Sequence, residues 1–154
     1  MFIKPITDRT QIDVDYAKTR LQAIKVELMN YNVEELKGCL NISDLNRIET
    51  NLSHIASNLN NLNYTVNIQT KQWDMQSVPK QSDINRILNN LRILTIAFHT
   101  ILSVPTKMTH FEDINTLENS IEILNNWVSN SNKFKRCGKL TCGNGFKLPI
   151  KGGV

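Results

Sequence analysis

The sequence predicts a mainly α protein: an antiparallel four-helix bundle with a C-terminal β-hairpin or extended arm. Four segments repeat apolar residues at alternating steps of three and four, which is the pattern of helices that share an apolar seam. Pro79 and Pro105 lie between predicted helices, where proline is tolerated. The chain has 154 residues, of which 40% are hydrophobic and 21% charged, as in one folded domain. We expect the bundle at 1–132 and the arm at 133–154.

Each helix is predicted from one apolar series that stays on a single face. The predicted helices span about 12–31, 43–62, 82–103 and 111–131. Strands would show alternation with period two, which these segments lack. The series are Val14, Ala17, Leu21, Ile24, Leu28 and Tyr31; Leu45, Ile48, Leu52, Ile55, Leu59 and Leu62; Ile84, Ile87, Leu91, Leu94, Phe98 and Ile101; and Ile114, Leu117, Ile121, Leu124 and Val128.

The starts of the later helices carry typical residues. Ser43 and Ser82 precede apolar series and are predicted as N-caps. Asp44, Asp83 and Asp113 follow in the first turns, where a helix favours a carboxylate.

The third helix carries more apolar residues than its seam requires. Leu88, Ile93, Ile96 and Leu102 spread around its circumference. A helix with this pattern is buried on several sides. It is either the central helix of the bundle or a contact between subunits.

A weak internal repeat is visible at an offset of 39 residues. The segment from Ser43 to Ile48 matches the segment from Ser82 to Ile87, and Asp113 to Leu117 is a poorer third copy. Either the same kind of helix start recurs, or a helical hairpin was duplicated.

A long connector separates the second and third predicted helices, at 63–80. Tyr64 to Ile68 alternates and is consistent with one short strand. Trp73 lies in the same connector. It is either a lid over the open end of the bundle or an exposed anchor for a partner.

The C-terminal arm is basic and contains several glycines. No acidic residue follows Glu122, and the arm holds six Lys and Arg residues in a chain whose net charge is +4, so the rest is net negative. Such an arm either binds nucleic acid, weakly and with salt sensitivity, or is solvated or in contact with an acidic neighbouring subunit. We favour the solvated or inter-subunit arm.

No catalytic, cofactor or metal site is predicted. His54, His99 and His110 do not stand in a nucleophile or phosphate-binding motif. Cys137 and Cys142 are a close pair, but a structural zinc site needs a second pair. We expect free thiols there, with a cross-strand disulfide or a zinc site shared between subunits as alternatives. Neither a signal peptide nor a membrane span is expected.

Several short motifs resemble those of small structural proteins encoded in the tail and baseplate modules of phages and prophages of Gram-positive bacteria. Pro5 to Arg9 resembles their opening segment, and Asp44 to Ile48 and Asp83 to Ile87 resemble their helix core. Thr70 to Trp73 resembles their Thr-Lys-x-Trp segment, and Leu148-Pro149 their C-terminal pair. The two cysteines of the arm have no counterpart in that pattern.

The resemblance implies a non-enzymatic subunit of a phage tail, baseplate or phage-tail-like particle, located in the virion or that particle. We expect a homo-oligomer that also contacts other particle proteins. The alternative is a cytosolic helical adaptor that binds nucleic acid through its arm. The side chains expected to contact partners are Trp73, Ile93, Ile96, Phe134, Lys135, Arg136, Lys139, Phe146, Lys147 and Leu148.

Overall fold

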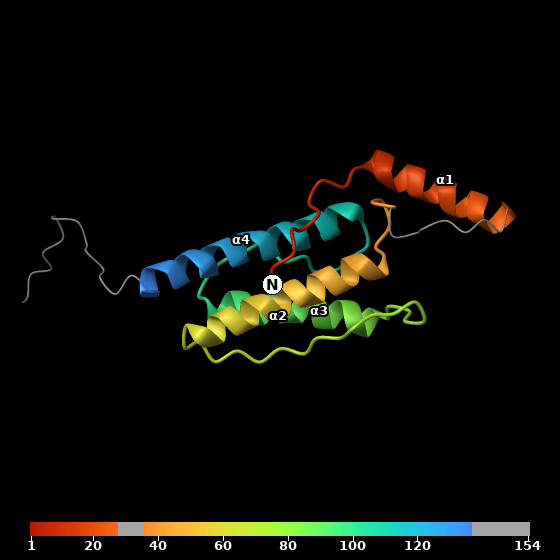
Figure 1. Cartoon of the computed structure of the whole chain (residues 1–154). Helices are drawn as coiled ribbons and strands as arrows, with labels where there is room; N and C mark the ends of the chain where they lie inside the picture. Colours follow the sequence, from red (N-terminus) through yellow and green to blue (C-terminus); the bar gives the residue numbers. More distant parts are fainter. Residues whose placement is uncertain (28–35, 137–154) are drawn as a thin grey trace, which may run out of the picture.

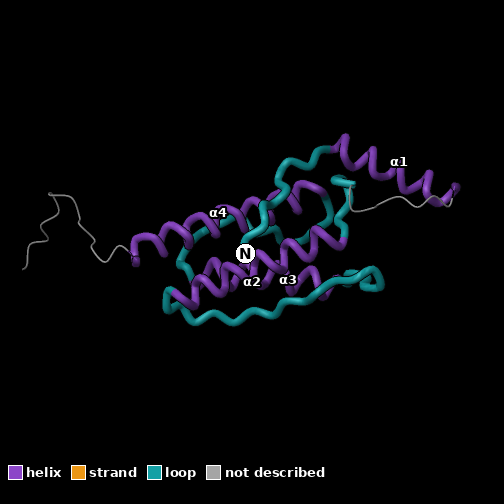
Figure 2. Tube along the Cα trace, in the orientation of Figure 1, coloured by secondary structure: helices purple, strands orange, loops and turns teal. Residues whose placement is uncertain are grey.

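A computed structural model describes residues 1–27 and 36–136. The helices are α1 (Gln11–Glu27), α2 (Ile42–Asn61), α3 (Gln81–Ala97) and α4 (Phe111–Arg136), and the described residues form no strand (Figure 2). The mainly α fold with four helices is therefore confirmed. The predicted hairpin, at 137–154, lies outside the described residues. Residues 133–136 belong to α4 and not to an arm, because the helix continues past its predicted end.

The core lies between α2, α3 and α4. The predicted seams of these helices meet there, and each of their central residues is at most 1% exposed. Within α1, none of the side chains described at 11–22 belongs to this core cluster, and Figure 1 shows α1 beside one end of the other three. The central residues are Leu45, Ile48, Leu52, Ile55 and Leu59 of α2; Ile87, Leu91 and Leu94 of α3; and Leu117, Ile121, Leu124 and Val128 of α4.

The three core helices run in the same direction, so the predicted antiparallel arrangement is wrong. In Figure 1 α2, α3 and α4 all begin near α1 and end on the opposite side. The N-terminal halves of these helices also meet one another, since Glu49 of α2 binds Arg86 of α3, and Arg47 of α2 binds Glu118 of α4 at 2.7 Å. At the other end, the rings of Tyr64 and Phe98, which follow α2 and α3, are 5.8 Å apart.

Two long connectors make the parallel arrangement possible. Residues 62–80 and 98–110 run back along the bundle as extended chain (Figure 2). A helix rises about 1.5 Å per residue, whereas extended chain covers about 3.3 Å, so either connector can return from the end of one helix to the start of the next. The segment from Tyr64 to Ile68 is extended, but it is not the strand the alternation suggested.

Asparagine side chains hold the extended segments against the helices. In each case the amide oxygen accepts a backbone N–H and the amide nitrogen donates to the carbonyl of the same residue, so one side chain replaces a strand neighbour. These asparagine clamps, with distances of 2.8 to 3.2 Å, join Asn51 to Ile3, Asn60 to Val66, Asn46 to Trp73 and Asn115 to Arg9.

The bundle is built from one unit that occurs three times, an extended segment followed by a helix. The units are 1–9 with α2, 62–80 with α3, and 98–110 with α4. In each helix the first-turn aspartate accepts the N–H of the residue three positions earlier. Seven residues after that aspartate, a side chain binds the backbone of the unit's own extended segment. These pairs are Asn51 with Ile3, Asn90 with Gln69 and Ser120 with Ser103.

The two ion pairs between core helices follow the same repeat. In each pair the arginine lies three residues after the first-turn aspartate of its own helix. The glutamate lies five residues after the first-turn aspartate of a neighbouring helix. Arg86 binds Glu49 in this way, and Arg47 binds Glu118. A recurring helix start would not produce contacts this far into the helices. The repeat is therefore a segment-and-helix unit and not a duplicated helical hairpin.

The ends of the helices differ in detail from the prediction. The N-caps are Asn41 and Lys80, two residues before Ser43 and Ser82, and only Asn41 caps with its side chain. α3 ends at Ala97 and not at 103, because His99 takes a left-handed backbone conformation with φ 52°. Apolar periodicity continues to Ile101 in the sequence, but that side chain is 97% exposed.

Candidate functional site

The first unit carries an insertion that the other two lack. Between its extended segment and α2, the chain leaves the bundle through α1 and returns at about residue 41. In the other units the extended segment leads directly into its helix. The insertion is therefore the part of the described chain that the core does not require, and such additions commonly carry function.

One glycine fixes α1 to the chain that enters α2. A Cβ atom on Gly38 would lie 2.0 Å from the carbonyl oxygen of Asp13, so only glycine allows this close approach. Lys37 adds ion pairs to Asp8 at 3.0 Å and to Asp13 at 3.9 Å. Asp13 also accepts the N–H and hydroxyl of Thr10, and these bonds lower its pKa. The start of α1 is thus held in one place.

Below α1, the extended segment 1–9, which we call the strap, ends in a buried ionic cluster. Arg9, 3% exposed, binds Asp44 at 3.0 Å and Glu118 at 3.3 Å. Arg47 binds the same two carboxyl groups. Glu118 also accepts the backbone N–H of Ile6. The formal charges of the four side chains cancel, which is the condition under which a buried ionic group is tolerated.

The side chains that receive the strap come from two helices. Asp44 and Asn51 of α2 and Asn115 and Glu118 of α4 bind it directly, and Arg47 of α2 binds the two carboxyl groups; we call these five residues the strap seat. Burial alone would lower the pKa of Arg47, but hydrogen bonds and charge from Glu118 and Asp44 outweigh it and raise the pKa. Arg47 therefore keeps its charge inside the cluster.

Apolar side chains on α1 face solvent. Ile12 is 80% exposed and Tyr16, one turn later on the same side, is 56% exposed. The Arg20 guanidinium lies 5.6 Å from the centre of the Tyr16 ring and donates to its hydroxyl at 3.1 Å. Ile12 and Tyr16 therefore form an apolar surface on the inserted helix, held in part by Arg20.

A cavity of about 350 Å³ lies between α1 and the start of α4. Its apolar walls come from Val14, Leu40, Met108, Phe111 and Ile114. Polar side chains at its border come from Gln11, Lys18, Thr109 and His110. The cavity separates the inserted helix from the bundle over part of its length.

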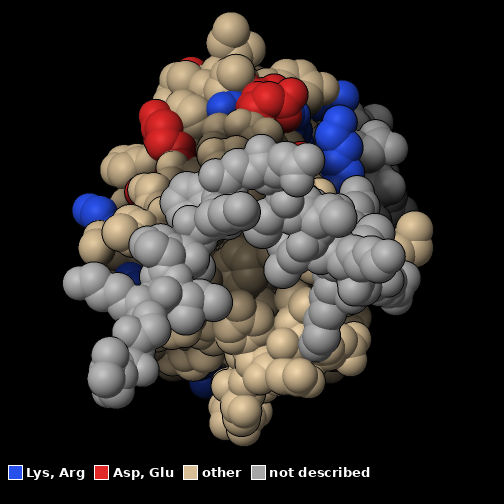
Figure 3. Space-filling view, turned by 90° about the vertical axis from the view of Figure 1, so that its left-hand side faces the viewer, with Lys and Arg blue, Asp and Glu red and all other residues tan. Residues whose placement is uncertain are grey.

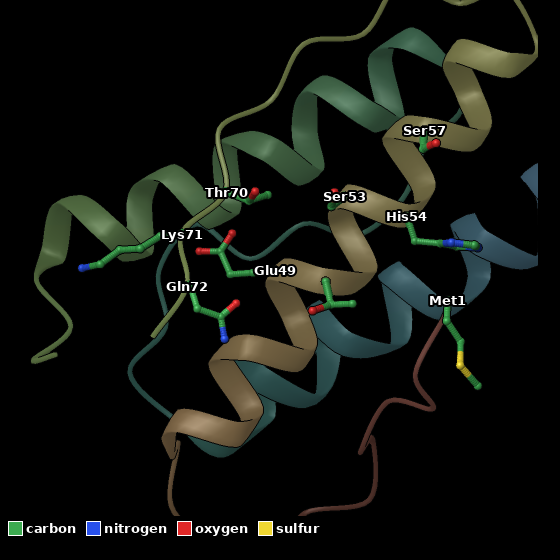
Figure 4. A pocket seen from close by; sticks show the side chains of 9 residues that line it. Met1, Glu49, Ser53, His54, Ser57, Thr70, Lys71 and Gln72 are labelled. Carbon is green, nitrogen blue, oxygen red and sulfur yellow. The ribbon is translucent and has the colours of Figure 1, made fainter. Parts of the chain in front are cut away.

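A second, larger cavity of about 500 Å³ lies on the outer face of α2 (Figure 4). Ser53, His54 and Ser57 reach it from α2, and Thr70 lies across from them on the connector. Burial, and then the nearby N-terminal amino group, lower the pKa of His54. Glu49 also lines the cavity, but it is bound to Arg86 at 2.5 Å. The walls are mainly neutral and polar, and the acid is already paired.

The residues predicted to contact partners do not come together. Trp73 is 2% exposed, belongs to the core cluster and donates from its indole to Glu49 at 3.4 Å, so it is not an exposed anchor. Ile93 is partly buried against the core, whereas Ile96 is 71% exposed. Sequence reasoning missed Ile12 and Tyr16, because only the fold shows that their helix stands outside the core.

The remaining predicted residues belong to the C-terminal part. Phe134, Lys135 and Arg136 lie in the last turns of α4, and only their backbone is described. Four others lie outside the described residues, as does the pair Cys137 and Cys142: Lys139, Phe146, Lys147 and Leu148.

The end of the bundle where α2, α3 and α4 finish is partly uncharged. In Figure 3, which looks onto this end, charged side chains gather in the upper part of the view, and the described residues visible in the lower part are mostly uncharged. In the three-unit repeat, exposed Ile96 of α3 is at the position equivalent to Ser57 of α2 and Asn126 of α4. Trp127 of α4, 40% exposed, takes the place of Asn58 in α2. Equivalent positions are therefore polar on one helix and apolar on another.

Within the described residues, no three His, Cys, Asp or Glu side chains gather as metal ligands. None of the described helices is long and apolar enough to cross a membrane. Cys39 is a free, partly buried thiol whose pKa is raised by burial. No protein-family model, no curated protein and no solved structure matches this chain.

Proposed function

We propose that the chain is a non-enzymatic structural subunit of a phage tail, a baseplate or a phage-tail-like particle. It acts by oligomeric assembly and by contacts with neighbouring subunits. The kind of particle rests on the resemblance of the motifs at Pro5 to Arg9, Asp44 to Ile48 and Thr70 to Trp73.

One observation carries the assembly role: an inserted helix stands outside a core that is complete without it. The described side chains of α1, at 11–22, do not join the core cluster, and Ile12 and Tyr16 are presented to solvent. An apolar pair on a protruding helix is a suitable anchor for a neighbouring surface. The same helix is fixed at its start by Gly38, so it presents this pair in a defined position.

The test is the native mass of the purified full chain, measured by light scattering on a sizing column at moderate salt. We expect a discrete oligomer, and a smaller species for the double variant Ile12→Gln/Tyr16→Gln. Met75→Gln/Val78→Gln is the matched control, because those side chains are 80% and 76% exposed but lie outside α1. A monomer at every concentration would contradict self-assembly. An unchanged mass in the α1 variant would show that α1 is not the contact.

A further inference from the structure

We propose that the strap is exchanged between copies of this chain, so that residues 1–9 of one copy occupy the strap seat of a second copy. This inference rests on the proposed assembly role and names the segment through which copies join. The partner copy would then contribute Arg9 to the buried ionic cluster of its neighbour.

The strap seat is chemically incomplete without a strap. Asp44 and Glu118 are 2% and 1% exposed, and Arg47 alone cannot balance both carboxyl groups. Arg9 supplies the second positive charge. A buried carboxylate without a partner is strongly unfavourable, so the seat selects an extended segment that brings a guanidinium group.

The seat also fixes the register of that segment. Asn51 holds both backbone groups of Ile3, and Asn115 holds both backbone groups of Arg9. Between them, Glu118 accepts the N–H of Ile6, and Arg9 donates to the Ile6 carbonyl at 2.6 Å. The recognised feature is therefore an extended backbone with an arginine six residues after its first clamped residue. Residues 1–9 of a second copy satisfy every one of these contacts.

The topology lets the strap leave without disturbing the core. The chain departs from the bundle at Arg9 and returns beside Asp44, and these two side chains are 3.0 Å apart. The excursion between them includes α1, about 25 Å long at 1.5 Å per residue, which adds nothing to the core cluster. Exchange requires the contacts of Gly38 and Lys37 with Asp8 and Asp13 to release, and the strap then moves to another copy while α2, α3 and α4 keep their contacts. The other two extended segments each connect two core helices and lack this freedom.

Cross-linking distinguishes a strap in its own seat from an exchanged one. The rings of Phe2 and His54 are 6.1 Å apart, and neither side chain belongs to the seat. The full chain carries Phe2→Cys and His54→Cys, with Cys39, Cys137 and Cys142 changed to Ser. It is refolded from urea at two concentrations tenfold apart, bridged with a short bismaleimide and separated on a denaturing gel.

Exchange predicts a covalent dimer whose share rises by up to about tenfold between the two concentrations, while it is the minor species. The single variants Phe2→Cys and His54→Cys show how much dimer arises without exchange. A second pair, Ile3→Cys with Thr50→Cys, uses exposed positions in case the first pair disturbs folding.

Covalent monomers alone, at both concentrations and for both pairs, would overturn the exchange. That result together with an oligomer on the sizing column would leave the proposed assembly role standing, since copies would then join by another surface. Covalent monomers together with a monomeric native mass would refute both proposals.

Discussion

At the scale of single residues, the asparagine side chain supplies the backbone pairing that extended segments need. The chain has 20 asparagines, many in helices, where this residue is otherwise unfavourable. Four of them clamp both backbone groups of one residue in an extended segment. The benefit of these bonds therefore lies outside the helix that holds the asparagine, and a count of asparagines in the sequence cannot reveal it.

The clamp can be tested against its equivalent in another unit. Asn46→Ala removes both bonds to Trp73, so we expect a loss of about 1–3 kcal/mol in the free energy of unfolding. Asn85 has the equivalent position in α3, where it is exposed and binds Gln81. Asn85→Ala should be neutral or slightly stabilising, because alanine favours the helix. Urea unfolding measures both changes. Equal changes in the free energy of unfolding for Asn46→Ala and Asn85→Ala would refute the clamp.

Asp113 gives the stability a defined dependence on pH. The backbone N–H groups of Thr109 and His110 hold its pKa below the ordinary value of 3.8. A carboxyl group with a lowered pKa in the folded state stabilises above its unfolded pKa, and this contribution disappears as the pH falls through the folded pKa. Asp113→Ala should therefore cost about 1 kcal/mol at pH 7.

The difference between wild type and Asp113→Ala should shrink as the pH falls below about 4, because the wild-type carboxyl group then becomes protonated. Thermal unfolding from pH 7 to pH 3 measures this difference. Glu112→Ala is the control, since Glu112 is an exposed neighbour in the same first turn. A difference that stays constant over the whole range would contradict the assignment.

At the scale of elements, the apolar seams identify the helices but not their roles. The central residues of the seams of α2, α3 and α4 are buried as predicted, whereas Ile101, at the predicted end of the third seam, is exposed. The seam of α1 looked equivalent, yet its described side chains, Val14, Ala17 and Leu21, do not join the core cluster. Leu28 and Tyr31 of the predicted seam lie outside the described residues. Its Ala17 is buried elsewhere, outside that cluster. An apolar seam indicates that a helix is packed on one face, but it does not show which part of the molecule covers that face.

Gly38 provides a test of how α1 is held. Gly38→Ala places a Cβ 2.0 Å from the Asp13 carbonyl oxygen, so α1 must shift. We expect faster hydrogen exchange at the amides of α1, with protection in α2, α3 and α4 unchanged, because the core does not include α1. Lys37→Ala removes only partly exposed ion pairs and should change exchange much less. Unchanged protection of α1 in Gly38→Ala would show that it is held by other contacts.

At the scale of the whole molecule, the direction of the helices was the main failure of sequence reasoning. An apolar seam is the same whether its neighbours run parallel or antiparallel. The informative signal was the length of the connector at 63–80, which is more than antiparallel neighbours need. The connector at 98–110 looked short in the sequence, because the third helix was predicted to continue to 103. The repeat was also visible in the sequence, but its extended half was not, because its contacts are between backbone and distant side chains.

The candidate site was even less predictable for the same reason. Arg9 and Glu118 are more than a hundred positions apart, and neither lies in a motif that suggests a buried ion pair. Ile96 was predicted as a partner contact and is exposed, whereas Trp73, another candidate for such a contact, is buried. Pairings between distant residues can be identified only from the fold, whereas the helices that hold these residues can be predicted from the sequence.

The shared direction of α2, α3 and α4 also gives the molecule an electric polarity. Each helix carries about half a positive charge at its start and half a negative charge at its end, and in parallel helices these dipoles add. Asp44, Asp83 and Asp113 offset the positive end. The last turns of α2 and α3 contain no basic residue, whereas those of α4 contain Lys133, Lys135 and Arg136. A neighbour that approaches this end therefore meets a partial negative charge at α2 and α3 and a positive charge at α4.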